Sequence, residues 1–151
     1  MKNCPMLLIA ICLMASCKQQ VPENNQPDIK GSWKLISGTL VENGISQTTD
    51  YTRSISFIKI INDTHFSFLK HDLQKGKDST ASFGAGGGTY TLKDSTYTEH
   101  LEYCSDRVWE GNDFSFTVTL KNDTLIQKGV EKIEKEGINR LNIEKYVRFK
   151  Q

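Results

Sequence analysis

The chain has few of the residues that favour helices or form covalent cross-links. Beyond residue 16 it contains only two alanines but 13 threonines, a composition that favours strands over helices. Cys104 is the only cysteine after residue 17, so no disulfide can form between later positions. No apolar run reaches the roughly 20 residues that a membrane-spanning helix needs. The sequence therefore predicts an all-β domain that is held together by its core.

An excess of charge of either sign is also missing. From residue 17 onward the chain carries 18 basic and 18 acidic side chains. This balance argues against nucleic acid or an anionic membrane surface as an electrostatic partner. The same part of the chain keeps all 14 aromatic residues, and each of them can bury about 150–250 Å². We therefore expect one compact core rather than a disordered chain.

Residues 1–16 have the composition of an export signal. One lysine precedes a 12-residue apolar run that ends in small residues immediately before Cys17. The segment 13–17, Leu-Met-Ala-Ser-Cys, resembles the lipobox of bacterial lipoproteins, with Met14 where leucine is usual. The resemblance implies cleavage before Cys17, attachment of palmitate-type acyl chains, and anchoring in the cell envelope on the periplasmic or outer-membrane side. An ordinary cleaved signal peptide followed by an unmodified cysteine is the alternative.

The segment that follows the cysteine has the composition of a tether. Residues 18–28 contain two prolines, three glutamines and two asparagines but one apolar residue, which is typical of a solvated linker. We therefore divide the chain into a signal peptide at 1–16, a lipidated cysteine and flexible tether at 17–28, and one domain at 29–151.

Alternation of apolar and polar residues marks most of this domain. In 114–120, Phe, Phe, Val and Leu occupy every second position, the period of a strand with one buried face. Asn or Asp with Ser or Thr separates successive runs at 61–64, 92–95 and 120–124, a composition that closes tight hairpins. The polar segment 41–51 is the best candidate for a helical turn. The expected strands cover about residues 30–40, 54–61, 64–71, 87–92, 96–103, 114–120, 124–130 and 141–149.

Successive hairpins of this kind predict an antiparallel up-and-down meander of about eight to ten strands. An open meander has two edge strands, whose unpaired backbone groups can pair with another chain. We expect it to close into a barrel, because closure leaves no edge unpaired. A β-sandwich or an open sheet is the alternative arrangement.

Motifs in the first, middle and last strands carry a family resemblance. Gly31 and Trp33 open the first strand, and Arg148 stands near the end of the last. The segments Gly-Gly-Gly-Thr-Tyr-Thr-Leu at 86–92 and Thr-Tyr-Thr-Glu-His at 96–100 lie between them. Together these residues resemble the lipocalin and fatty-acid-binding superfamily, and in particular small exported lipocalin-like bacterial proteins of unknown function. The resemblance implies a calycin-like barrel whose floor is closed by Trp33 beneath Arg148, and it implies no particular ligand.

One face of the strand at 96–103 combines aromatic rings with a carboxylate. Strict alternation places Glu99 on the side that carries Tyr97, Leu101 and Tyr103. If this face lines the barrel, the carboxylate must be paired or must have a raised pKa. A barrel interior with rings and a few polar groups is suited to binding a small molecule. The side chains predicted to line such a site are Tyr90, Tyr97, Glu99, Leu101, Tyr103, Phe114 and Phe116.

Two other interpretations of this strand remain open. Glu99 can have a purely structural role, paired inside the barrel with a base such as Lys145 or Arg53. The opposite register would instead turn His100 and Glu102 inward.

Sequence motifs of catalysis and metal binding are missing. The chain has no Gly-x-Ser-x-Gly or His-Glu-x-x-His motif. The three glycines at 86–88 are not followed by the Lys-Ser/Thr of a phosphate loop. His65 and His71 are six residues apart on one expected strand, which separates them by roughly 20 Å. We therefore expect no enzyme activity, no cofactor and no metal site.

The expected function is that of a monomeric, membrane-anchored lipocalin-like lipoprotein that binds a small apolar molecule in its barrel. Its only membrane contact would be the lipid on Cys17, and it would not bind nucleic acid. The alternative is an envelope interaction or structural module with a filled core and no ligand, for which Trp109 is a candidate surface contact.

Overall fold

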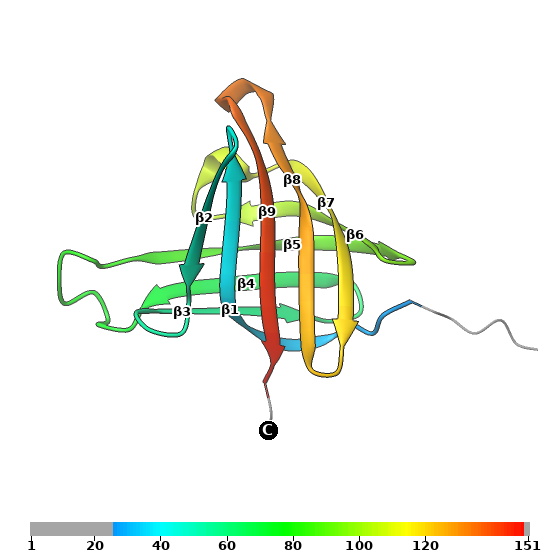
Figure 1. Ribbon diagram of the computed structural model, residues 1–151, viewed down its shortest axis with the longest axis horizontal. Helices are drawn as coiled ribbons and strands as arrows, with labels where there is room; N and C mark the ends of the chain where they lie inside the picture. Colours follow the sequence, from blue (N-terminus) through cyan, green and yellow to red (C-terminus); the bar gives the residue numbers. More distant parts are fainter. Residues whose placement is uncertain (1–25, 150–151) are drawn as a thin grey trace, which may run out of the picture.

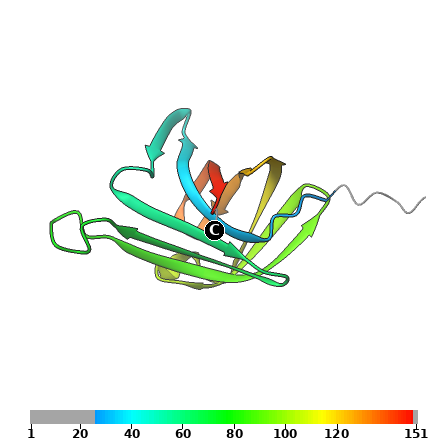
Figure 2. The ribbon, with the colours of Figure 1, turned by 90° about the horizontal axis from the view of Figure 1, so that it is seen from below.

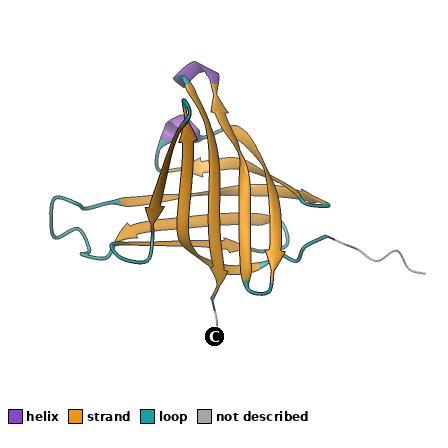
Figure 3. Ribbon diagram, in the orientation of Figure 1, coloured by secondary structure: helices purple, strands orange, loops and turns teal. Residues whose placement is uncertain are grey.

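Strands account for most of the part of the chain that the computed structural model describes, residues 26–149 (Figure 3). Two short 3₁₀ turns interrupt them, η1 (Arg107–Trp109) and η2 (Glu134–Glu136). Within these residues no helix is long and apolar enough to cross a membrane. The strands are β1 (Gly31–Glu42), β2 (Ile45–Asp50), β3 (Ile55–Ile61), β4 (His65–Asp72), β5 (Phe83–Lys93), β6 (Thr96–Cys104), β7 (Asn112–Lys121), β8 (Thr124–Ile133) and β9 (Ile138–Arg148).

The sheet closes on itself. From β3 to β9 each strand pairs antiparallel with the next, β3 pairs with β1, and β1 pairs with β9. Strands β1 and β3–β9 therefore form a closed eight-stranded up-and-down barrel, and the predicted fold is confirmed. In Figure 1 strands β3–β6 run across the view, whereas β1, β9, β8 and β7 run along it, so the two halves of the barrel wall cross.

Strand β2 lies outside the closed circuit. The first part of β1, residues 31–34, pairs with β3, but its later part, residues 37–42, pairs with β2 instead. Strand β2 has no pairing with β3, and all six of its residues are exposed. Figure 2 shows the β1–β2 hairpin leaning away from β3. The wall of the barrel is therefore splayed at this point.

The hairpin turns use asparagine and aspartate in the left-handed conformation. Asp94 (φ 54°) and Asn122 (φ 53°) lie in two of the turns that the sequence predicts. The helical turn expected within 41–51 was wrong, because Asn43 and Gly44 (φ 50° and 78°) join β1 to β2 as a hairpin. Asn-Gly favours a type of turn that needs positive φ at both central positions.

The end of the barrel opposite the splayed hairpin is closed by Trp33. Its side chain is fully buried, and its Nε1 donates to the backbone oxygen of Ile29 at 2.8 Å. The guanidinium of Arg148 lies over the indole ring, with 4.2 Å between Cζ and the ring centroid. Gly31 is required beside it, because its φ is 129° and a Cβ there would lie 2.6 Å from Arg148 Nη1. This end is the floor of the barrel.

Candidate functional site

A cavity of about 440 Å³ opens toward the splayed end of the barrel. It is bounded by residues of all nine strands, of η1, of the segment after β2 and of the connection between β6 and η1. Its volume is within the range of about 300–1,000 Å³ that is usual for small-molecule sites. The apolar lining residues are Leu40, Tyr51, Phe57, Phe68, Leu101, Cys104, Trp109, Phe114 and Phe116.

Three aromatic rings form one wall of the cavity. Phe57 on β3 stacks on Phe68 on β4, with 5.6 Å between ring centroids and 13° between ring planes. Tyr51, which follows β2, meets Phe57 edge to face at 5.9 Å. These rings line the cavity beside the place where β1 exchanges its partner β3 for β2.

The inner part of the cavity is polar. The ammonium group of Lys59, on β3, donates to Glu99 Oε1 at 2.7 Å and to Gln127 Oε1 at 3.0 Å. A second carboxylate oxygen, Glu144 Oε2, lies 3.9 Å from the same nitrogen and accepts a hydrogen bond of 2.8 Å from the Tyr146 hydroxyl. Lys59 is only 2% exposed, so its charge depends on these partners for stabilisation.

Burial and the neighbouring charges shift the pKa values of Lys59, Glu144 and Tyr146. Burial by itself would lower the pKa of Lys59, but the carboxylates of Glu99 and Glu144 outweigh burial and raise it, so the side chain is a cation. Burial raises the pKa of Glu144, and the nearby Lys59 charge offsets this only in part. Burial, followed by the charge of Glu144, raises the pKa of Tyr146. Lys59 is thus no candidate for a neutral nucleophile.

A second ion pair lies nearer the mouth. Glu131 accepts from Arg140 Nε and from Asn142 Nδ2, both at 2.7 Å. The guanidinium of Arg140 also lies over the ring of Trp109, with 4.7 Å between Cζ and the centroid. Trp109 is therefore half-buried and packed against the barrel.

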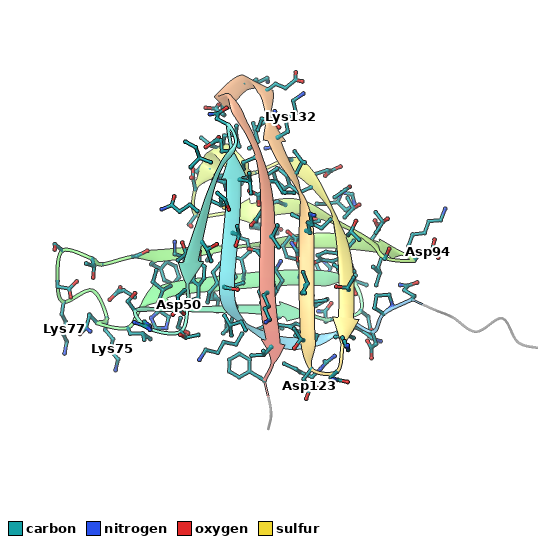
Figure 4. The ribbon with its side chains drawn as sticks, in the orientation of Figure 1. Asp50, Lys75, Lys77, Asp94, Asp123 and Lys132 are labelled. Carbon is teal, nitrogen blue, oxygen red and sulfur yellow. The ribbon has the colours of Figure 1, made fainter. Side chains whose placement is uncertain are left out.

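The charged side chains at the ends of the strands are exposed to solvent, unlike those of the interior. Asp94 and Asp123 are exposed in turns and Lys132 near the end of β8, and Figure 4 shows their side chains pointing away from the barrel. Lys75 and Lys77 extend into solvent on the long β4–β5 connection. The charged groups of the cavity are thus a distinct set.

Four of the seven side chains predicted for the ligand site line the cavity: Glu99, Leu101, Phe114 and Phe116. Tyr97 is buried behind them, and among the described residues its hydroxyl has no hydrogen-bond partner. Tyr90 lies toward the floor, where its hydroxyl donates to the backbone oxygen of Asn62 at 2.7 Å.

Tyr103 points outward, so the strict alternation that placed it inside was wrong. Its side chain is 69% exposed. In the β5–β6 pairing Gly87 faces Tyr103, but Gly88 faces Leu101, so Glu102 is an extra residue in β6. Such a bulge shifts the following side chains to the opposite face.

The partner of Glu99 also differs from both bases that the sequence suggested. Lys145 is exposed on β9, and Arg53 pairs with Asp50 at 3.2 Å, whereas Lys59 contacts Glu99. The opposite register of β6 was wrong, because Glu102 is exposed and accepts from Thr89.

Sequence reasoning missed Lys59, Gln127 and Glu144. One signal pointed to Lys59, since it is the only charged residue in the apolar run 54–61. Gln127 and Glu144 had no comparable signal, because each stands beside a lysine in a strand that holds several other polar residues.

No protein-family model and no curated protein matches the chain. In residues 26–149, no three His, Cys, Asp or Glu side chains are grouped so as to hold a metal ion. Proposals about function therefore rest on the barrel and its cavity.

Proposed function

We propose that this chain is a lipocalin-like protein that binds a small, largely apolar molecule in its barrel. The observation that carries the proposal is the cavity of about 440 Å³, whose lining combines a wall of rings with a few buried polar groups. Contact with the rings drives binding by about 25 cal/mol for each Å² of apolar surface buried. The polar groups orient one end of the ligand.

We also propose that the protein works at the cell envelope, attached through a lipid on Cys17. The resemblance of residues 13–17 to a lipobox supports this; Cys17 itself lies outside the described residues. The chain enters the barrel at the floor, where Ile29 packs against Trp33. An anchor on this side leaves the mouth of the cavity accessible.

Binding of a neutral fluorescent probe, N-phenylnaphthylamine, tests the proposal. We expect probe fluorescence to rise on addition of the protein and the probe to be displaced by apolar competitors. A Leu40→Trp variant is the matched control, because Leu40 lines the cavity and the larger side chain narrows it. Equal binding of the probe to both proteins would place it outside the cavity and contradict the proposal.

One observation favours the second function, an interaction module. Leu69, Phe83 and Tyr103 are 40%, 71% and 69% exposed on the neighbouring strands β4, β5 and β6. Exposed apolar side chains gathered in this way mark contact surfaces. If the protein acts through this surface, replacing Phe83 and Tyr103 by serine abolishes its crosslinks in the envelope and leaves probe binding unchanged.

A further inference from the structure

The carboxylates that line the cavity outnumber the cationic groups. Four acidic side chains contribute to the lining, and three basic ones do. The acidic residues are Glu99, Asp106, Glu131 and Glu144, and the basic residues are Lys59, Lys70 and Arg140.

The two short ion pairs leave Glu144 sharing Lys59 with Glu99, at a longer distance from its nitrogen. Lys59 is bonded to Glu99 at 2.7 Å, and Arg140 is bonded to Glu131 at 2.7 Å. Glu144 is 3.9 Å from Lys59, and its one described hydrogen bond comes from the neutral Tyr146 hydroxyl. Its side chain is only 15% exposed, so solvent does little to stabilise a negative charge there.

Both paired cations of the interior, Lys59 and Arg140, contact a carboxylate on one side and the face of an aromatic ring on another. The Lys59 nitrogen lies 5.2 Å from the centroid of the Tyr146 ring and 5.8 Å from that of Phe66. Arg140 stacks on Trp109 in the same way. Such contacts between a cation and a ring strengthen when water is excluded.

The wall formed by Tyr51, Phe57 and Phe68 offers this setting beside Glu144. Among the described residues, no cationic group lies over these three rings. Glu144 pairs with Gly38 across β9 and β1, and a Cβ at Gly38 would lie 3.1 Å from Tyr51 Cε2. The ring of Tyr146, whose hydroxyl donates to Glu144, meets Phe57 with 6.4 Å between centroids. These rings thus face the same cavity as a carboxylate that shares its nearest cation, Lys59, with Glu99.

We propose that the ligand is an amphipathic amine, whose ammonium group binds the carboxylate of Glu144 and whose apolar body packs against Tyr51, Phe57 and Phe68. This inference rests on the proposed function, since it specifies the class of molecule that the cavity binds. A fatty acid is disfavoured, because its carboxylate would lie among carboxylates.

Calorimetry with three probes of equal chain length tests the proposal on the full chain at neutral pH. Octylamine, octanol and octanoate differ only in carrying a positive, a neutral or a negative head group. We expect octylamine to bind about tenfold more tightly than octanol, as one charge-assisted hydrogen bond allows, and octanoate to bind most weakly. Binding that is unchanged in the Leu40→Trp variant is attributed to adsorption elsewhere on the chain.

A Glu144→Gln variant then assigns the preference to one side chain. We expect it to lose the roughly tenfold preference for octylamine while its affinity for octanol changes less than about twofold. Glu102→Gln is the matched control, because it removes the same charge from the outer face of β6.

The outcomes separate this inference from the proposed function. If none of the three probes binds, the cavity is not a site for small amphipathic molecules, and both proposals fall. If octanol or octanoate binds as tightly as octylamine, only the amine proposal is overturned. An amine preference that persists in Glu144→Gln overturns the role of Glu144. The comparison of probes on the unmodified chain decides the ligand class even if the variant does not fold.

Discussion

At the scale of single residues, Lys59 carries a charge that the barrel interior tolerates only because its partners are in place. Its nitrogen contacts Glu99 and Gln127, and the three side chains come from β3, β6 and β8. Removing the cation leaves a carboxylate and an amide oxygen buried without their donor, which costs far more than losing an exposed pair.

We therefore expect Lys59→Met to lower the free energy of unfolding by about 3–5 kcal/mol, measured by urea denaturation. The double variant Lys59→Met with Glu99→Met should recover a large part of this loss, because it also removes the isolated carboxylate. A loss below about 1 kcal/mol, which is typical of exposed pairs, would contradict the buried pair described here.

These pairings show where prediction from sequence stops. Alternation identified Glu99 as an inward carboxylate, because a two-residue period needs only local information. The identity of its partner depends on strand registers that join positions 40 residues apart. Both bases suggested beforehand were wrong for this reason.

Glu144 gives a second prediction at this scale, a pH dependence of stability. Burial raises its pKa in the folded protein above the ordinary value of 4.5. The folded state therefore holds the proton more tightly than the unfolded state, and ionisation costs stability as pH rises from that value through the raised one. Lys59, Glu99, Glu131 and Tyr146 are the ionisable neighbours that set the shift.

Glutamine cannot ionise, so the stability of Glu144→Gln relative to the parent protein should increase over this pH window. Urea denaturation at several pH values measures the difference. Glu102→Gln is the control, because its stability relative to the parent protein should change with pH in the opposite direction. Hydrogen bonds from Thr89 lower the pKa of Glu102, so its contribution is present above the ordinary value and is lost as pH falls. A pH-independent difference for Glu144→Gln would contradict the assignment.

At the scale of elements, strand β5 depends on a glycine at the bulge that it shares with β6. A Cβ at Gly88 would lie 2.0 Å from the backbone oxygen of His100 and 2.8 Å from the backbone nitrogen of Glu102. Backbone atoms in a barrel wall cannot move aside as a flexible side chain can.

Gly88→Ala should therefore lower the free energy of unfolding by about 3 kcal/mol in urea denaturation, at the upper end of what overpacking usually costs. Gly84→Ala, in the same strand, is the matched control, since its nearest contacts would be 3.8 and 3.9 Å away. We expect that change to stay within about 0.5 kcal/mol. Similar effects of the two substitutions would show that close approach at the bulge does not decide the choice of glycine.

The same bulge explains which elements could be predicted. The expected strands at 96–103 and 114–120 agree with β6 and β7 to within a few residues, because their alternation is strong. Alternation does not reveal an inserted residue such as Glu102, which leaves the apolar pattern unchanged until Tyr103. The hairpin at Asn43 and Gly44 was missed, although its dipeptide is a strong turn signal, because β2 lacks an apolar face.

At the scale of the whole molecule, closure was predictable but the hollow interior was not. A long meander of short strands must cover its edges, and pairing of β1 with β9 does so. The cavity arises where β1 exchanges β3 for β2, and its volume depends on how many large side chains point inward. A periodic pattern alone predicts neither the exchange of partners by β1 nor the volume that the inward side chains leave empty.

The position of the floor gives the last prediction, which concerns attachment. Residues 17–28 can span at most about 43 Å when fully extended, at roughly 3.3–3.6 Å per residue, so a lipid on Cys17 would keep the floor near the membrane. Each buried methylene of an acyl chain contributes about 0.8 kcal/mol, and two or more chains give stable attachment. We therefore expect Cys17→Ser to move the protein from the membrane fraction to the soluble fraction.

Cys104→Ser is the matched control, because it also removes one cysteine but lies in the barrel at the end of β6. It should remain with the membranes, and probe binding to the released Cys17→Ser protein should match that of the parent, since the cavity lies at the opposite end from the tether. If Cys17→Ser stays with the membrane fraction, a contact other than a lipid on that cysteine holds it there. The exposed side chains of Leu69, Phe83 and Tyr103 would then be the surface to test next.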